Sequence, residues 1–215
     1  GITCWLASHD WIMSLEPEWT STMFGVYNFG GLFLSSLAAI TVLVVWRRSR
    51  RHSKFPVSGS QLHDLGTLLF AFSSFWMYLW FCQYWLIWYV NNPEETIWFV
   101  RRSHDHWPAL SLLNLALNWG IPFSVLLFRA AKRNPYILGG VALVILMGRW
   151  LDLFEMILPS QPNALPAFGV IEAGLLLGAA GAFLWAMDFA LSDDVVDPQP
   201  TARTPRREGI AGGAV

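Results

Sequence analysis

The sequence predicts an all-α integral membrane protein with about five transmembrane helices in a bundle. Of its 215 residues, 54% are hydrophobic and 13% are charged, whereas a soluble domain carries about 25% charged residues. Five mainly apolar runs each reach the roughly 20 residues that cross a hydrocarbon core about 30 Å thick. Thirteen residues are tryptophan, a residue type that is enriched where membranes meet water.

Three spans are predicted in the first part of the chain. The first covers residues 22–46 and ends at the basic segment RRSRRHSK. The second covers residues 62–90, which is long enough to tilt or to project past the interface. The third covers residues 107–128 and contains Pro122, which frees a backbone carbonyl and favours a kink.

Two more spans complete the predicted bundle. The fourth covers residues 136–158 and leads into the breaker-rich segment PSQPNALP. The fifth covers residues 168–191 and is rich in Gly and Ala, so it can approach a neighbouring helix closely. We therefore expect an external segment at residues 1–20, a five-helix bundle at 21–192, and a disordered cytoplasmic tail at 193–215.

Basic residues predict the orientation, because Lys and Arg in short loops favour the cytoplasmic side. Eleven of the fourteen follow the first, third or fifth span, which places the C-terminus in the cytoplasm. Only Arg101 and Arg102 lie in loops on the other side, so the loops at 91–106 and 159–167 are expected to be external. The eleven are Arg47, Arg48, Arg50, Arg51, Lys54, Arg129, Lys132, Arg133, Arg203, Arg206 and Arg207.

The beginning of the chain also carries information. An odd number of spans places residues 1–20 outside, and the chain starts at Gly1 rather than at Met. Its first residues, GITCWLA, resemble the end of a further apolar segment. We expect a preceding piece that is either missing from this chain or separate from it.

Ionisable residues inside spans are costly, which makes them functional candidates. Arg149, Asp152 and Glu155 have the spacing i, i+3, i+6 and form one stripe of the fourth helix. Facing a wet interior, this stripe could relay protons; alternatively, an Arg–Asp pair fixes packing and Glu155 lies in the headgroup zone. Glu172, near the start of the fifth helix, either extends the cluster or sits at the positive end of the helix dipole.

Two further pairs lie at span ends. His63 and Asp64 begin the second helix on the expected cytoplasmic side, where a histidine would suit proton uptake. The alternative is that Asp64 caps the first turn. On the external side, Glu94 and Glu95 follow Pro93, and they either begin a new helix at its positive end or dock a peripheral partner.

No redox centre or metal site is predicted in the chain itself. The five histidines lie near span ends or in loops, the chain has no CxxCH, cysteine cluster or glycine-rich nucleotide loop, and Cys4 and Cys82 do not form a CxxC. The second span is dense in aromatic residues, which suit either a quinone surface or an interfacial belt. They include Trp76, Tyr78, Trp80, Phe81, Tyr84, Trp85, Trp88 and Tyr89.

Several long motifs together resemble one family. They are HDWIMSLEPEWTSTMFGVY at 9–27, LHDLGTLLFAF at 62–72, QYWLIWYVNNPEETIWFVRR at 83–102 and PFSVLLFRAAKRN at 122–134. In this order they resemble the ActF-type integral membrane subunit of bacterial alternative complex III, over about residues 8–158. That subunit is a ten-helix relative of the NrfD-like subunit, so this chain would correspond to its C-terminal half.

The resemblance implies a place in a quinol:electron-acceptor oxidoreductase of the bacterial cytoplasmic (inner) membrane. Quinol would be oxidised mainly in the NrfD-like membrane subunit, and electrons would pass to iron–sulfur clusters and haem c in an iron–sulfur subunit and multihaem cytochrome c subunits. This chain would hold no cofactor and would provide a scaffold and a possible proton path. Besides these subunits its partners would be membrane lipids, and no nucleic acid.

The family motifs carry over five candidate residues. His63 and Asp64 are implied on the cytoplasmic side, and Asp10, Glu94 and Glu95 on the external side. The ionisable stripe of the fourth span rests instead on the physical argument above. Two other functions stay open: a purely structural membrane anchor, and a small-solute or ion transporter subunit, although transporters usually show internal repeats and none is obvious here.

Overall fold

The computed structural model is built of helices, and it describes residues 1–17, 19–49, 58–104, 107–160 and 169–192. No strand occurs in these ranges. Five helices are long and apolar enough to cross a membrane: Phe24–Arg48, Gly59–Val90, Trp107–Leu126, Pro135–Ile157 and Val170–Phe189. The predicted all-α fold is therefore confirmed, and its composition is that of a multi-pass membrane protein.

The chain divides into two compact units, Gly1–Ala167 and Phe168–Val215, which are described separately. The first contains, in order, α1 (Ile2–Trp11), η1 (Met13–Leu15), α2 (Phe24–Ser49), α3 (Gly59–Val90), α4 (Pro93–Arg101), α5 (Trp107–Leu115), η2 (Ala116–Gly120), α6 (Ile121–Leu126), α7 (Arg129–Arg133), α8 (Pro135–Ile157) and η3 (Leu158–Ser160).

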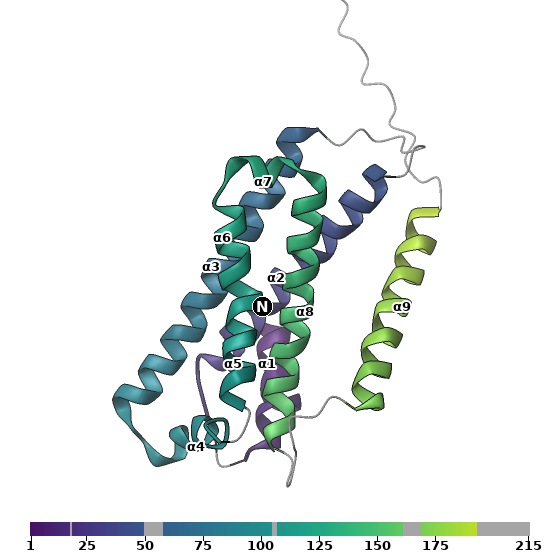
Figure 1. Ribbon diagram of the computed structural model, residues 1–215. Helices are drawn as coiled ribbons and strands as arrows, with labels where there is room; N and C mark the ends of the chain where they lie inside the picture. Colours follow the sequence, from purple (N-terminus) through teal and green to yellow (C-terminus); the bar gives the residue numbers. More distant parts are fainter. Residues whose placement is uncertain (18, 50–57, 105–106, 161–168, 193–215) are drawn as a thin grey trace, which may run out of the picture. The chain divides into compact units, whose positions relative to one another are not determined.

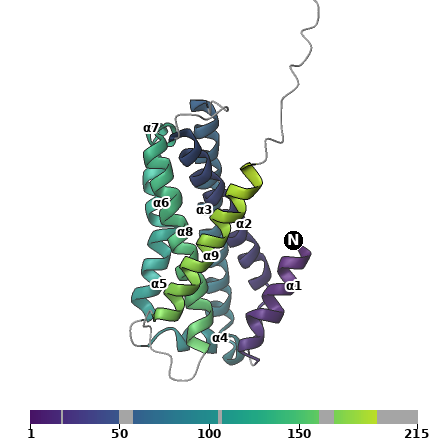
Figure 2. The same ribbon diagram turned by 90° about the vertical axis from the view of Figure 1, so that its right-hand side faces the viewer.

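Four long segments of the first unit run side by side (Figure 1). α2 packs against both α3 and α8, and α5, η2 and α6 together form one span that packs against α3 and α8. α1 lies alongside α2, as Figure 2 also shows. The end of α2, the start of α3 and basic α7 share one end of the bundle, while α4 lies at the opposite end.

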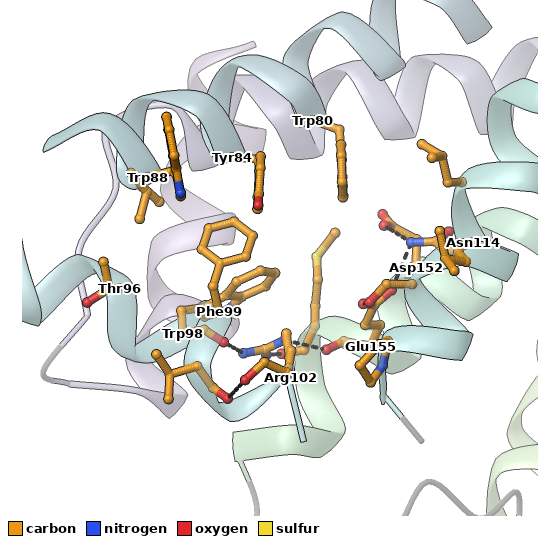
Figure 3. Close-up of a pocket in the computed structure, with 18 of the residues that line it drawn as sticks. Trp80, Tyr84, Trp88, Thr96, Trp98, Phe99, Arg102, Asn114, Asp152 and Glu155 are labelled. Atoms are coloured by element: carbon orange, nitrogen blue, oxygen red, sulfur yellow. Dashed lines mark hydrogen bonds between the residues drawn. The ribbon is translucent and has the colours of Figure 1, made fainter. Parts of the chain in front are cut away.

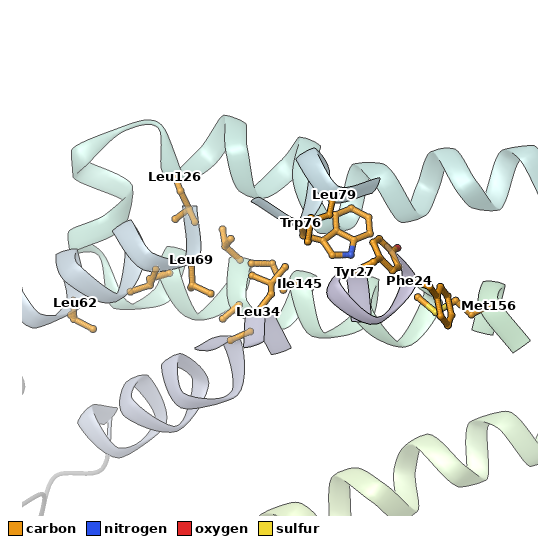
Figure 4. Packing of buried hydrophobic residues seen from close by; sticks show 14 of the residues in the cluster. Phe24, Tyr27, Leu34, Leu62, Leu69, Trp76, Leu79, Leu126, Ile145 and Met156 are labelled. Atoms are coloured by element: carbon orange, nitrogen blue, oxygen red, sulfur yellow. The ribbon is translucent and has the colours of Figure 1, made fainter. Parts of the chain in front are cut away.

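The apolar interior runs along this bundle. Figure 4 shows Leu34 of α2, Leu69 of α3 and Ile145 of α8 meeting in it, and all three are fully buried. Toward the α4 end the core changes to larger side chains, with Trp76 against Tyr27 at a ring-centroid distance of 5.8 Å. The other faces of the spans carry exposed apolar side chains, as expected for surfaces that contact lipid.

α3 begins earlier than the sequence predicts because of a capping box. The Ser58 backbone amide donates to Gln61 Oε1 at 2.9 Å, and the Gln61 amide donates to Ser58 Oγ at 3.3 Å. His63 and Asp64 therefore lie beyond the first turn, and the alternative that Asp64 caps this helix is wrong. The helix ends at Asn91, which adopts the left-handed conformation with φ 50°.

The third span is interrupted where Pro122 was expected to disturb it. A π-helical turn, Ala116–Gly120, separates α5 from α6, and Pro122 lies in the first turn of α6. Because proline has no amide hydrogen, Pro122 cannot donate to the carbonyl of Asn118, four residues earlier. Ser73 Oγ of α3 donates to that carbonyl at 2.5 Å, so the carbonyl that Pro122 cannot serve binds the neighbouring helix.

The second unit contains α9 (Val170–Ser192), an apolar helix with Glu172 in its first turn. This is the position at which a carboxylate is favoured by the helix dipole, as one of the two sequence interpretations proposed. The other, that Glu172 extends the charged cluster of the fourth span, stays a prediction. The predicted disordered tail, 193–215, and most of the predicted loop at 159–167 lie outside the described residues.

We expect Ser73→Ala to lower stability, because it leaves the buried Asn118 carbonyl without its donor. An unpaired buried acceptor costs about 1–3 kcal/mol. Ser74→Ala is the matched control, since the described hydrogen bond of the Ser74 hydroxyl lies within its own helix, to the Phe70 carbonyl at 2.9 Å. Thermal unfolding in detergent measures both variants, and equal melting temperatures would contradict the assigned role of Ser73.

Candidate functional site

A buried ion pair forms the centre of the candidate site. Arg149 Nη1 lies 2.7 Å from Asp152 Oδ2, and both residues are almost fully buried on α8. The guanidinium passes Gly31 of α2 so closely that a Cβ at this position would overlap it. Its central carbon also lies 5.5 Å from the ring centroid of Trp76. The i, i+3 pairing predicted from the sequence is thus confirmed, inside the bundle.

Asn114 of α5 links the two acidic residues of α8. Its Nδ2 donates to Asp152 Oδ1 at 2.8 Å and to Glu155 Oε2 at 3.1 Å. The Tyr27 hydroxyl of α2 donates to the same Asp152 oxygen at 2.5 Å, and the Ser111 hydroxyl donates to Glu155 Oε1. Glu155 is therefore buried in a hydrogen-bond network, and the alternative that it lies at the depth of the headgroup zone stays a prediction.

The network continues along the third span toward the middle of the bundle. Asn118 Nδ2 donates to Asn114 Oδ1 at 2.5 Å and to the Asn114 carbonyl at 3.0 Å. The Asn118 carbonyl in turn accepts from Ser73. Polar groups in an apolar interior are costly unless they are hydrogen-bonded. The connected set from Glu155 to Ser73 therefore forms a polar column inside an otherwise apolar bundle.

A cavity of about 670 Å³ opens beside this column. Trp80, Tyr84 and Trp88 project into it from one face of α3, as Figure 3 shows. Trp98 and Phe99 of α4 form the facing wall, and Asn114, Asp152 and Glu155 form a polar end. The aromatic residues of the second span thus fall into groups. Trp80, Tyr84 and Trp88, four residues apart, line this cavity, and Trp76 lies in the core. The exposed ones are Tyr78, Phe81, Trp85 and Tyr89.

Arg102 closes the cavity at the α4 end. Its Nε and Nη2 donate at 3.0 Å to the carbonyls of Glu155 and Met156, which belong to the last turn of α8. A cation is favoured at the carbonyl end of a helix. Its Nη1 donates to the Trp98 carbonyl at 2.9 Å and lies 3.5 Å from Glu16 Oε1. Burial lowers the pKa of Arg102 to about 10, so the side chain stays charged at neutral pH.

Only the fourth-span residues of the sequence prediction meet in this site. His63 and Asp64 form a pair of their own, with Nδ1 and Oδ1 3.7 Å apart and Asp64 largely exposed, at the other end of the bundle. Glu94 and Glu95 lie in the first turn of α4, as one of their two interpretations expects, and the docking of a peripheral partner stays a prediction. Asp10 is exposed near the end of α1.

Sequence reasoning missed most partners of the carboxylates. A pattern in the third span could have identified some of them. Spacings of three and four residues place three polar side chains on one face of this apolar span: Ser111, Asn114 and Asn118. Tyr27 gave no such signal, since it lies 125 residues from its partner Asp152. Arg102 was identified only as a loop residue, and its neighbours on α8 are equally remote in the chain.

Metal ligation is not indicated in the part of the chain that the structure describes. No group of three or more His, Cys, Asp or Glu side chains that could hold a metal ion occurs there. The column offers instead carboxylates, hydroxyls and amides in a row. The carboxylates and hydroxyls can donate, accept and pass on protons, and the amides can orient them or a polar ligand in the cavity.

We expect Arg102→Ala to destabilise the protein strongly. Removal of one partner of a buried ion pair costs about 3–5 kcal/mol, because the other charge, here Glu16, stays buried. Arg101→Ala is the matched control: Arg101 Nη1 lies 3.6 Å from Glu16 Oε2, but its side chain is 43% exposed. Its loss should cost about 1 kcal/mol or less. Comparable losses of thermal stability in the two variants would contradict the conclusion that Arg102 holds α4 to the end of α8.

No protein-family model matches the chain, and no curated protein is significantly similar to it.

Proposed function

We propose that this chain is a membrane subunit of a quinol-oxidising electron-transfer complex, and that the polar column around Asp152 forms part of a proton path. The observation that carries the proposal is the pair of buried carboxylates, Asp152 and Glu155, joined by one amide at the polar end of a cavity. Ionisable groups at this depth in a membrane bundle are costly and are retained for function.

The geometry supports proton transfer through side chains. The Tyr27 hydroxyl donates directly to Asp152 at 2.5 Å, a distance that permits transfer between these two groups. Asn114 donates to both Asp152 and Glu155, so it holds the two carboxylates beside one another but does not itself relay a proton. Arg149 balances the charge of Asp152, so the column can hold a carboxylate in an apolar interior. Among the described residues no arginine forms an ion pair with the Glu155 carboxylate, which makes Glu155 the more adaptable proton acceptor of the two.

In this proposal the chain carries no redox centre itself. Quinol oxidation takes place in a neighbouring NrfD-like subunit, and iron–sulfur and haem c subunits take the electrons. The motif resemblance between residues 8 and 158 supports this assignment of partners. The cavity lies at the α4 end, which the distribution of basic residues predicts to be the external end.

One observation favours a second candidate, a structural anchor for peripheral subunits. Arg102 joins α4, the end of α8 and Glu16 through buried contacts that have no need of a proton. Trp19 adds to this assembly, because its indole donates to the Glu95 carbonyl at 3.1 Å and stacks on Trp98. Both functions share one scaffold, and they differ in whether the carboxylates are used.

We expect Glu155→Gln to reduce proton translocation severalfold while the protein still assembles. The change keeps the size of the side chain and removes the proton acceptor, and no arginine among the described residues loses an ion-pair partner. Asp152→Asn should give the same loss, with an added cost in stability because Arg149 loses its counter-charge. Proton movement is measured in vesicles that contain the reconstituted complex during quinol oxidation.

Asp188→Asn, the same chemical change in α9, is the control and should leave translocation unchanged. The triple variant with Asp152, Glu155 and Glu172 replaced by their amides separates the two functions. The anchor predicts normal turnover and normal coupling in this variant. The proton path predicts turnover without coupling, and unchanged proton movement would rule it out.

A further inference from the structure

The end of the bundle at α7 combines exposed basic side chains with exposed apolar ones. We infer that α7 and the residues on either side of it bind an anionic phospholipid, whose phosphate lies against Arg129 and Arg133. This inference goes beyond the proposed function, and it requires only that the chain spans a membrane.

α7 connects the third and fourth spans and is held against the bundle. It packs against α3 and α8, and Ala131 is buried. The stem of Lys132 lies on Gly66 of α3, where an added Cβ would be only 3.0 Å from Lys132 Cβ and Cγ. Lys132 Nζ lies 4.9 Å from the ring centroid of Phe70, a cation–π contact. These contacts fix α7 at the level where the two spans end.

The two arginines of α7 remain on the surface. Arg129 and Arg133 are exposed and four residues apart, so they are neighbours on one side of this short helix. No ion pair or side-chain hydrogen bond joins either of them to another residue that the structure describes. A guanidinium group presents a fork of donors that matches the oxygens of a phosphate. The pair therefore offers an anion two such forks.

The surroundings of α7 favour an anionic ligand. α2 ends at the same end of the bundle with Arg47 and Arg48 in its last turn (Figure 1). The first turn of α8 contains no acidic residue. Among the described residues of the first unit, Asp64 is the only acidic one at this end, and His63 lies 3.7 Å from it. A zwitterionic headgroup would bring an ammonium group into this basic region, which like-charge repulsion opposes.

Exposed apolar residues flank the arginines and indicate a lipid. Leu127 and Phe128 precede α7 and are 57% and 66% exposed, and Tyr136 follows it and is 82% exposed. At the end of a membrane span such side chains contact acyl chains, and tyrosine is enriched at the level of the headgroups. A ligand that meets both surfaces carries a phosphate and acyl chains in one molecule. Basic clusters beside a span are the usual sites of anionic lipids.

Side chains rather than backbone amides form this site. Asn134 Oδ1 accepts from the amides of Tyr136 and Ile137 at 3.0 and 3.5 Å, so the start of α8 already has its acceptor. Substitution of the arginines therefore tests the site directly.

The test uses the protein extracted in mild detergent with any subunits that accompany it, placed in phosphatidylcholine nanodiscs. The probe is phosphatidylglycerol with a photoreactive diazirine near the headgroup end of one acyl chain. Phosphatidylcholine with the same diazirine is the comparison probe. We expect the first probe to label peptides from residues 127–137 more strongly than the second. Unlabelled phosphatidylglycerol should compete, whereas inorganic phosphate at the same concentration should not, because it lacks acyl chains.

The double variant Arg129→Gln/Arg133→Gln should label about 25-fold less at low probe concentration. Each arginine near an anionic lipid contributes about fivefold to binding. Arg101→Gln is the matched control, because Arg101 is an exposed arginine on α4, at the opposite end of the bundle, and its loss should leave labelling unchanged. Melting temperatures in detergent establish that both variants fold.

Equal labelling of residues 127–137 by the two probes would overturn the inference, and this comparison on the unaltered protein needs no variant to fold. Unchanged labelling in the double variant would overturn the role of the arginines. Competition by inorganic phosphate as strong as that by phosphatidylglycerol would overturn the lipid as the ligand. Proton movement plays no part in these measurements, so the lipid site and the proton path stand or fall separately.

Discussion

The burial of one arginine–aspartate pair in an apolar bundle constrains much of the structure around it. A buried charge is tolerated only where its partner and its hydrogen bonds are in place. Gly31 is needed because the Arg149 guanidinium occupies the space of a side chain. Tyr27 and Asn114 are needed because the second oxygen of Asp152 would otherwise lack donors. A single ion pair on α8 thus determines what α2 and α5 can present to it.

Hydrogen bonding also constrains the third span, where a π-helical turn and Pro122 interrupt the α-helix. Pro122 removes the donor that the Asn118 carbonyl would normally use, and the π turn before it accommodates the proline. Ser73 supplies the missing hydrogen bond from α3, while the Asn118 side chain holds Asn114. The orientation of Asn114, and with it the link between the two carboxylates, therefore depends on contacts made by three different helices.

What could be predicted from the sequence was mainly local. Span lengths and the Arg149–Asp152 pairing follow from spacing along one helix, and the structure has both. Spacing also identifies the carbonyl to which Pro122 cannot donate, and in the structure it accepts from Ser73. The start of α3 depended on a capping box just before the apolar run. Tyr27 and Arg102 are long-range partners of α8, and nothing in their own segments identifies them. The aromatic residues of α3 divide by a spacing of four, which becomes meaningful only once α4 provides the opposite wall.

Glu155 connects the structural and the functional parts of this arrangement. Its backbone carbonyl accepts from Arg102, so its position is fixed by the contacts that hold α4 to α8. Its carboxylate lies apart from these backbone contacts and is directed toward Ser111, Asn114 and the cavity. Anchoring and proton handling therefore do not compete for the same atoms of this residue. A rigid backbone with an adaptable carboxylate suits a proton acceptor, because the acceptor must stay in reach of its partners while its charge changes.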